Sequence, residues 1–264
     1  MWEVGLSSHY MTNSRPRRLR ELNLEQHLRD PSARQAFVTP MFDLIAPHYD
    51  RFTRVFSFGM DQGWKSALVH AAAESIVTGG VVSDVATGTG DLAFALSAAR
   101  PDLAIAATDV SAEMLALALA RRTRSPTAMV SVAAGDIGSL PFPRASLDAV
   151  TASYALRNAP DWRASVAELA RVIRPGGHLF TLDFFLPESR LWRSAFLGWL
   201  AVAGRTVGWL WHREPVAYGY IAASIRHFTT ADGFAASLGE HGFDVRRIDL
   251  RLGGGIALHH AVRR

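Results

Sequence analysis

The chain contains no cysteine, and Lys65 is its only lysine. Without cysteine the chain has no disulfide bond, no thiolate nucleophile and no thiolate-held metal site, which fits a reducing compartment. The tryptophan-rich segment 191–211 is interrupted by Arg193 and Arg205, and the 11 uncharged residues between these arginines are too few to span a bilayer. The histidines lack ligand spacing, so no metal site is expected.

The bulk composition is that of a globular protein. Of the 264 residues, 49% are hydrophobic and 20% are charged, which is enough for one large domain with a sizeable core. The formal net charge is +4, and arginine supplies nearly all the positive charge. No basic run is interleaved with aromatic residues, so we expect no nucleic-acid partner.

The first forty residues differ from the rest. Four arginines, ending at Arg20, cluster after a polar start, without an apolar core of signal-peptide length. We expect residues 1–40 to form a flexible or helical extension and residues 41–264 to form a single domain. From Ser32 to Val77 apolar side chains recur at three- and four-residue spacing, which predicts helix.

After this helical region, predicted strands and helices alternate. Such alternation predicts a parallel, doubly wound α/β sheet, and the last two strands, joined without a helix, should include an antiparallel one. Ser111 is the expected N-cap of the second helix, and Pro175 and the two glycines after it end the third. The predicted strands are 81–86, 103–108, 128–133, 147–153, 178–184, 243–250 and 255–262, and the predicted helices are 91–100, 111–122, 161–173 and 230–241.

A glycine-rich turn after the first predicted strand is the most informative feature. In VVSDVATGTGD (81–91) a buried strand ends in the turn 87–90, and a helix with free N-terminal amide donors follows. Asp109 ends the next strand, where a carboxylate commonly binds both hydroxyls of a ribose. An adenosine-containing cofactor is therefore expected. A nicotinamide dehydrogenase, a nucleoside-sulfonium methyltransferase and a turn without a ligand all remain open on this segment.

Three further motifs stand at predicted strand ends. GDIGSLPFP (135–143) places Asp136 where a side chain can reach an adenine amino group. SYALRN (153–158) ends the fourth strand beside the crevice in which such sheets bind ligands, and RPGG (174–177) leads into the fifth. A dehydrogenase does not need this combination.

With these motifs in order, the chain resembles the ubiquinone/menaquinone C-methyltransferases of UbiE type, which are S-adenosylmethionine enzymes. The resemblance runs from about Met41 to Ala261. Its particular motifs are MFDLIAPHYD (41–50), YALRN, YGYIAASIRHF (218–228) and GGGIALH (253–259). It implies a Rossmann-like, seven-stranded class I methyltransferase fold, with S-adenosyl-L-methionine as cofactor and an inserted helical lid near 189–228.

The resemblance also implies the cofactor site. Asp84 is expected to face the ammonium group of the methionine part, and two glycines shape the loop. The implied cofactor-binding residues are Asp84, Gly88, Thr89, Gly90, Asp109, Asp136, Ile137 and Ser153.

The chain departs from the family pattern mainly where the acceptor should bind. Thr53 replaces the usual asparagine, and Tyr154-Ala155 replaces Phe-Gly before LRN. Apolar residues at 199–202 replace a proline and a tyrosine, and the ending ALHHAVRR lacks the usual lysine. These differences leave methyl transfer in place and leave the acceptor open.

The implied reaction is in-line transfer of the sulfonium methyl group to a ring carbon of a prenylated hydroquinone. The carbon becomes nucleophilic when the adjacent phenol, whose pKa is about 10, loses its proton. Arg157 is the candidate to stabilise the phenolate, with Asn158 and Tyr49 completing a hydrogen-bonded catalytic site. His227 and His259 are alternative proton acceptors.

Segment 191–211 has three readings: a helix in the membrane interface, a lid over an apolar ligand, or a helix buried against the domain. An isoprenoid tail on the substrate would favour the first, and Trp199 and Trp209 should then contribute to binding of anionic liposomes. Tyr218 and Tyr220 would line the acceptor pocket or pack in the core.

Two other functions stay open beside quinol methylation. One is a same-fold methyltransferase that acts on a soluble aromatic natural product, and the other is a non-catalytic cofactor-binding scaffold in a quinone-synthesis complex. The expected location is the cytoplasm, with peripheral association at the inner face of the membrane as a further expectation. The head group, the tail length and whether the chain forms a homodimer are left open.

Overall fold

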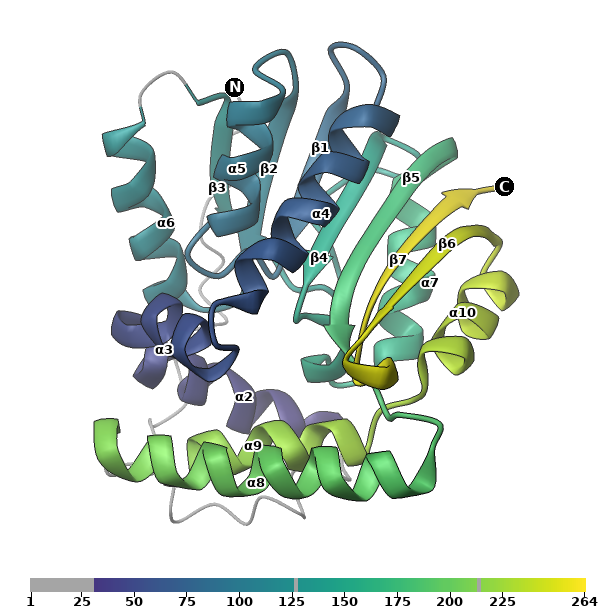
Figure 1. Cartoon of the computed structure of the whole chain (residues 1–264). Helices are drawn as coiled ribbons and strands as arrows, with labels where there is room; N and C mark the ends of the chain where they lie inside the picture. Colours follow the sequence, from purple (N-terminus) through teal and green to yellow (C-terminus); the bar gives the residue numbers. More distant parts are fainter. Residues whose placement is uncertain (1–30, 126–127, 213–214) are drawn as a thin grey trace.

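The computed structural model describes residues 31–264 except 126–127 and 213–214, and gives the backbone alone for 31–33, 205, 207–212 and 215–219. Seven strands form one sheet in the order β3-β2-β1-β4-β5-β7-β6 (Figure 1). β7 runs antiparallel to β5 and β6, and the other pairs are parallel, as the sequence predicts. The strands are β1 (Val81–Val85), β2 (Ala104–Asp109), β3 (Val130–Ala134), β4 (Leu147–Ser153), β5 (Ile173–Phe184), β6 (Phe243–Arg251) and β7 (Ile256–Arg263).

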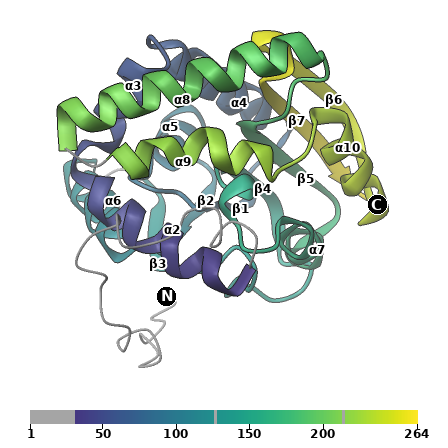
Figure 2. The same ribbon diagram turned by 90° about the horizontal axis from the view of Figure 1, so that it is seen from below.

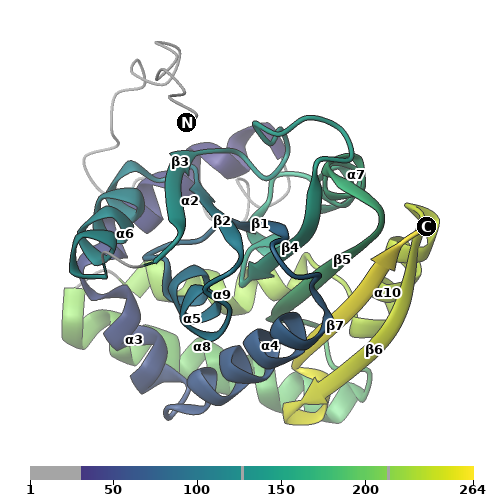
Figure 3. The ribbon, with the colours of Figure 1, turned by 90° about the horizontal axis from the view of Figure 1, so that it is seen from above.

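Helices cover both faces of this sheet (Figure 3). α4 and α5 bury Leu68 and Leu96 against one face, and α7 and α10 bury Leu169 and Phe234 against the other. Ser111 caps α6 by accepting a hydrogen bond from the amide of Met114, as expected. These helices are α4 (Met60–Ser75), α5 (Asp91–Ala99), α6 (Ala112–Arg124), α7 (Trp162–Val172) and α10 (Ala231–Glu240).

A second group of helices lies beyond the carboxyl ends of the parallel strands (Figure 1). α8 and α9 run side by side across this end, as seen from below in Figure 2. They bury Leu200 and Tyr220 together with Phe37 and Phe52 from the N-terminal helices, which builds a third apolar cluster. The group consists of α2 (Pro31–Ile45), α3 (Tyr49–Phe56), α8 (Arg190–His212) and α9 (Pro215–Arg226), with the short 3-10 helix η3 (Ala46–His48) between α2 and α3.

Two boundaries differ from the sequence prediction, and glycine and proline explain both. The continuous helical pattern from residue 32 to residue 77 is broken into α2, α3 and α4 near Pro47 and at Gly59, which has a φ of +77°. Strand β5 begins at Ile173 because the RPGG segment forms a bulge inside it instead of preceding it. A Cβ on Gly177 would lie 2.7 Å from the Ile173 side chain, so the bulge requires glycine.

The N-terminal helix and the inserted helices belong to the same body as the sheet. α2 crosses residue 40, where the sequence suggested that the domain begins, and Phe37 and Val38 are buried in the third cluster. The helical insertion expected near 189–228 is present as α8 and α9. Within the described part of the chain, none of the helices combines the length and apolar character needed to cross a membrane.

Candidate active site

The glycine turn after β1 is tied to Asp109 at the end of β2. Asp109 Oδ2 accepts a hydrogen bond from the Gly88 amide at 2.7 Å, and Oδ1 accepts one from the Ser111 amide at 2.9 Å. Burial raises the pKa of Asp109, although both amides favour its charged form. Gly90 has a φ of +82°, and a Cβ there would lie 2.8 Å from the Phe94 ring. The turn therefore needs a residue without a side chain.

A pocket with an empty volume of about 710 Å³, called here the loop pocket, opens beside this turn. Five of the predicted cofactor residues line it, together with Tyr49 and Asn158. The predicted cofactor residues in its lining are Gly88, Asp109, Asp136, Ile137 and Ser153. The structure thus brings together residues from the ends of β1, β2 and β4 and from the turn after β3.

Asp136 reaches this pocket with one partner that the sequence did not single out. Its Oδ2 accepts a hydrogen bond from Gln35 Nε2 at 2.9 Å, and its Oδ1 accepts one from the Gly138 amide at 2.8 Å. Gln35 lies on α2 and precedes the first family motif, which begins at Met41 on the same helix. A lone polar residue on a helix gives no signal that would have identified it.

Three predicted cofactor residues, Asp84, Thr89 and Gly90, do not line the loop pocket. Asp84 lies beneath the turn and accepts hydrogen bonds from the hydroxyls of Thr87 at 2.5 Å and Thr151 at 2.7 Å. Burial raises the pKa of Asp84 to about 6. These contacts show that Asp84 shapes the turn, and its contact with a methionine ammonium group stays a prediction.

A second pocket, of about 600 Å³ and called here the apolar pocket, adjoins the first. Phe42, Tyr49 and Tyr154 line both pockets, so the two spaces meet at these rings. Tyr154 has a φ of +55°, which is unusual for a residue with a side chain. The residues that line the apolar pocket are Met41, Phe42, Ile45, Tyr49, Phe52, Thr53, Phe56, Ser57, Asp61, Trp64, Tyr154, Arg157, Phe184, Tyr220 and Ile221.

Arg157 is held in this pocket by a buried carboxylate. The Nε of Arg157 lies 3.0 Å from Asp183 Oδ1, in an ion pair whose N–H is not aligned for a hydrogen bond. Its NH1 group donates to Asn158 Oδ1 at 2.7 Å and to Ser224 Oγ at 3.2 Å. Burial raises the pKa of Asp183, while the Arg157 charge favours its ionised form. Asp183 is an essential partner that the sequence analysis missed.

Asn158 positions its neighbours through both ends of its side-chain amide. Its Nδ2 donates to the carbonyl oxygen of Tyr154 at 2.7 Å, and its Oδ1 accepts from Arg157 and from the Tyr220 hydroxyl at 3.0 Å. Tyr220 both lines the apolar pocket and packs in the third apolar cluster, the two alternatives that the sequence left open, whereas the side chain of Tyr218 lies outside the described residues.

The predicted trio of Arg157, Asn158 and Tyr49 surrounds the junction of the two pockets. Tyr49 and Asn158 line the loop pocket, and Tyr49 and Arg157 line the apolar pocket. Burial raises the pKa of Tyr49, and the positive charges of Lys65 and Arg157 act in the opposite direction. At neutral pH the Tyr49 hydroxyl is a hydrogen-bond donor.

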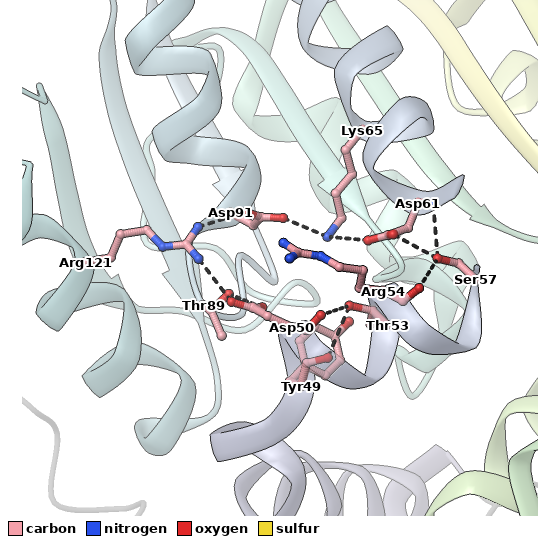
Figure 4. Close-up of polar contacts among 10 residues, drawn as sticks. All are labelled: Tyr49, Asp50, Thr53, Arg54, Ser57, Asp61, Lys65, Thr89, Asp91 and Arg121. Carbon is pink, nitrogen blue, oxygen red and sulfur yellow. Dashed lines mark hydrogen bonds and ion pairs between the residues drawn. The ribbon is translucent and has the colours of Figure 1, made fainter. Parts of the chain in front are cut away.

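A chain of alternating charges ties α3 and α4 to the glycine turn (Figure 4). Asp50 accepts a hydrogen bond from the Thr89 hydroxyl at 2.8 Å and pairs with Arg121 at 3.0 Å. Asp91 at the start of α5 pairs with Arg121 at 2.9 Å and with Lys65 at 3.0 Å. Thr89 thus contacts the N-terminal helices. The YD motif includes Asp50, but nothing in the motif indicates that Asp50 contacts Thr89 and Arg121.

The two histidines considered as proton acceptors line neither pocket. His259 is buried against Phe185 and Phe234, and its Nε2 lies 3.0 Å from the carbonyl oxygen of Ala231. Burial lowers the pKa of His259 to about 4, so it is neutral in the core. This position gives it a structural role.

Several departures from the family pattern lie at or beside the two pockets. Thr53 lines this pocket, and its hydroxyl donates to the backbone carbonyls of Tyr49 and Asp50. Ala155 has a φ of −101°, so the glycine common in the family is not needed there. Trp199 lies over Phe56 with ring centroids 5.6 Å apart. The differences change the wall that an acceptor would touch.

The sheet order, the antiparallel β7 and the glycine turn after β1 define the fold of the class I S-adenosylmethionine-dependent methyltransferases. Phosphoethanolamine N-methyltransferase 2 from Haemonchus contortus, solved in complex with S-adenosyl-L-methionine, shares this fold with a TM-score of 0.59 and 14% identity. The match covers 92% of this chain and 60% of that one.

The sequence matches the ubiE/COQ5 methyltransferase family over residues 30–263, and the chain belongs to that family. Demethylmenaquinone methyltransferase from Deinococcus radiodurans is 37% identical over 82% of this chain and 88% of the relative. The ubiquinone/menaquinone biosynthesis C-methyltransferase UbiE from Geobacter sulfurreducens is 34% identical over 78% and 80%, respectively. The protein is therefore a methyltransferase, and the dehydrogenase alternative is excluded.

Proposed function

We propose that this enzyme transfers the methyl group of S-adenosylmethionine to a ring carbon of a hydroquinone with an apolar tail, in the biosynthesis of a menaquinone- or ubiquinone-type quinone. The observation that carries the proposal is the junction of the loop pocket and the apolar pocket at Phe42, Tyr49 and Tyr154. A cofactor in the first pocket and an aromatic ring in the second would meet there. The names of the relatives support a quinone substrate.

The residues of the loop pocket fit an adenosine. Each Asp109 oxygen accepts one hydrogen bond from the protein, and a carboxylate oxygen can accept a second, so both oxygens can bind ribose hydroxyls. A Cβ on Gly88 would have its nearest neighbour, the Met114 sulfur, at 3.9 Å, so the backbone there is not crowded. When bound, S-adenosylmethionine supplies a methyl group activated by positive sulfur.

The apolar pocket fits a quinol ring and the start of an isoprenoid tail. Phe52, Phe56, Trp64 and Phe184 supply aromatic faces for the ring and its tail. Arg157 places a positive charge in this largely aromatic and aliphatic wall, where it stabilises the negative charge that develops on a phenol oxygen. The pairing with Asp183 fixes the guanidinium in position, and the net charge of the pair is smaller than that of the guanidinium alone.

Incubation with methyl-labelled S-adenosylmethionine and a panel of reduced quinones, with and without tails, tests this proposal. The expected product is a hydroquinone methylated on a ring carbon, and tailed acceptors should give a higher kcat/KM than tail-less ones. Equal activity on tail-less acceptors would favour a soluble aromatic substrate. Tight cofactor binding without transfer to any quinol would instead support a scaffold role.

A further inference from the structure

The proposed reaction releases one proton, and the apolar pocket contains one carboxylate among its described lining residues, Asp61. Asp61 is 4% exposed and lies in the first turn of α4. We propose that Asp61 is the base that takes the hydroxyl proton of the hydroquinone as the neighbouring ring carbon accepts the methyl group. This inference rests on the proposed function and adds the proton acceptor to it.

The position of Asp61 follows from the sharp corner between α3 and α4. Phe58 and Gly59 both adopt positive φ, +51° and +77°, and this turns the first turn of α4 toward the pocket. Ser57 donates its hydroxyl hydrogen to Asp61 Oδ1 at 2.8 Å, and Lys65 Nζ lies 3.7 Å from Oδ2 (Figure 4). Each oxygen keeps the capacity to accept another hydrogen bond.

No other described group that lines the pocket carries a basic lone pair at neutral pH. Burial raises the pKa of Tyr49, Tyr154 and Tyr220, so these phenols stay protonated. Arg157 is a permanent cation that pairs with Asp183. The remaining polar lining groups are hydroxyls and an indole, which are not bases in this pH range.

Lys65 supplies a positive charge next to Asp61. Burial acts to lower the pKa of Lys65, but Tyr49, Asp91 and Asp61 raise it, with a net upward shift. Lys65 is therefore a cation beside Asp61 and shares its charge with Asp91 at 3.0 Å. Of the described titratable groups, Lys65 on α4 and Tyr154 after β4 interact electrostatically with Asp61. Tyr49 on α3 and Arg157 on the 3-10 helix η4 (Leu156–Asn158) line the same pocket.

A carboxylate is a competent base here because the hydroxyl becomes acidic during the reaction. As the ring carbon bonds to the methyl carbon, the S–C bond breaks and sulfur keeps its electron pair. The phenol oxygen forms a carbonyl, and its proton moves to Asp61. The ring then regains aromaticity when the hydrogen on the methylated carbon leaves to water and Asp61 returns its proton to the oxygen. One proton is released overall, as the neutralised sulfonium requires.

Replacement of Asp61 by asparagine tests the assignment. Asp61→Asn should lower kcat by about 100-fold or more, the usual contribution of a general base, with unchanged affinity for S-adenosylmethionine. The residual rate of the variant should rise with pH as the phenol ionises in solution. A chlorinated form of the same tailed hydroquinone, whose phenol is more acidic, should recover most of the lost rate.

The controls separate a chemical role from a structural one. Asp232→Asn removes an exposed acid from the same position in the first turn of α10, far from both pockets, and should leave kcat unchanged. Asp61→Glu keeps a carboxylate and should keep the wild-type pH profile at a reduced rate, so it tests the role even if the asparagine variant does not fold.

Two outcomes overturn the assignment while leaving the proposed function intact. One is a kcat for Asp61→Asn within threefold of that of wild type. The other is a loss of kcat in Asp61→Asn that is equally large with the chlorinated and the unchlorinated hydroquinone. A wild-type enzyme that methylates no hydroquinone would instead contradict the proposed function itself.

Discussion

At the scale of single residues, the site consists of buried acids at strand ends, and each has a different kind of partner. Asp109 accepts hydrogen bonds from backbone amides, Asp84 from threonine hydroxyls, and Asp183 pairs with Arg157. These partners decide what each acid does, because a carboxylate without a cation nearby is costly to ionise when buried. Asp84 shows this most clearly, because its hydrogen-bond partners are uncharged hydroxyls and burial raises its pKa.

Asp84 should make the stability of the fold depend on pH. Its pKa is raised to about 6 by burial, above its ordinary value of 3.8, so the folded chain holds the proton more tightly than the unfolded chain does. The stabilisation is full below pH 4 and is lost as pH rises through 6. Between pH 5 and pH 7 the loss is about 1 kcal/mol in the free energy of unfolding.

Urea unfolding of wild type and Asp84→Asn at pH 5 and pH 7 measures this effect. Because asparagine does not titrate, the variant should gain about 1 kcal/mol relative to wild type between the two pH values. A constant difference between the two proteins at both pH values would contradict a raised pKa for Asp84.

The strand-end acids Asp109 and Asp136 could be predicted from the sequence because parallel strands bring their carboxyl ends to one edge. The partners of Asp50 and Asp183 could not be predicted in the same way. Asp50 contacts Thr89, 39 positions away, and Asp183 contacts Arg157, 26 positions away, across elements whose packing depends on side chains. The role of Asp61 could not be predicted from the sequence either, because Asp61 lines the pocket only as a result of the corner between α3 and α4.

At the scale of elements, α8 has two unlike sides. Phe196 and Leu200 are buried in the third apolar cluster, whereas Trp199 is 39% exposed and lies against Phe58 with ring centroids 6.1 Å apart. Phe58 itself is 77% exposed at the α3–α4 corner. Sequence periodicity could show that α8 is apolar and rich in tryptophan, but it could not show which side packs inward.

The exposed Phe58 and Trp199 lie beside the apolar pocket, because Trp199 also packs on Phe56 in the pocket wall. A tailed quinol remains in the membrane, since each buried methylene contributes about 0.8 kcal/mol. The enzyme should therefore co-sediment with anionic liposomes, helped by the exposed Arg51 and Arg54 on α3. The side chain of Trp209 lies outside the described residues.

The double variant Phe58→Ser with Trp199→Ala should leave several-fold more protein in the supernatant than wild type. Met129→Ser is the control, since Met129 is an apolar residue whose exposure, 62%, lies between those of Trp199 and Phe58, and it lies next to β3, away from α8. Equal recovery of wild type in the supernatant with and without lipid would refute membrane association.

At the scale of the whole molecule, the sheet supplies the cofactor edge and the helices beyond it supply the acceptor wall (Figures 1 and 2). The doubly wound sheet followed from the alternation of strands and helices, and the antiparallel strand followed from the last two strands being joined without a helix. The packing of the second group of helices was less predictable. α2, α3, α8 and α9 pack together through apolar contacts that have no fixed sequence spacing. The pockets meet where these two parts join.

The loop pocket should hold an adenosine whose ribose is bound by Asp109. Calorimetric titration of S-adenosylmethionine into wild type, Asp109→Ala and the exposed control Asp232→Ala tests this assignment most directly. Loss of charged hydrogen bonds to the ribose should weaken binding at least about tenfold in Asp109→Ala and leave the control unchanged. Wild-type affinity in Asp109→Ala, or no binding heat with the wild-type protein, would contradict the account.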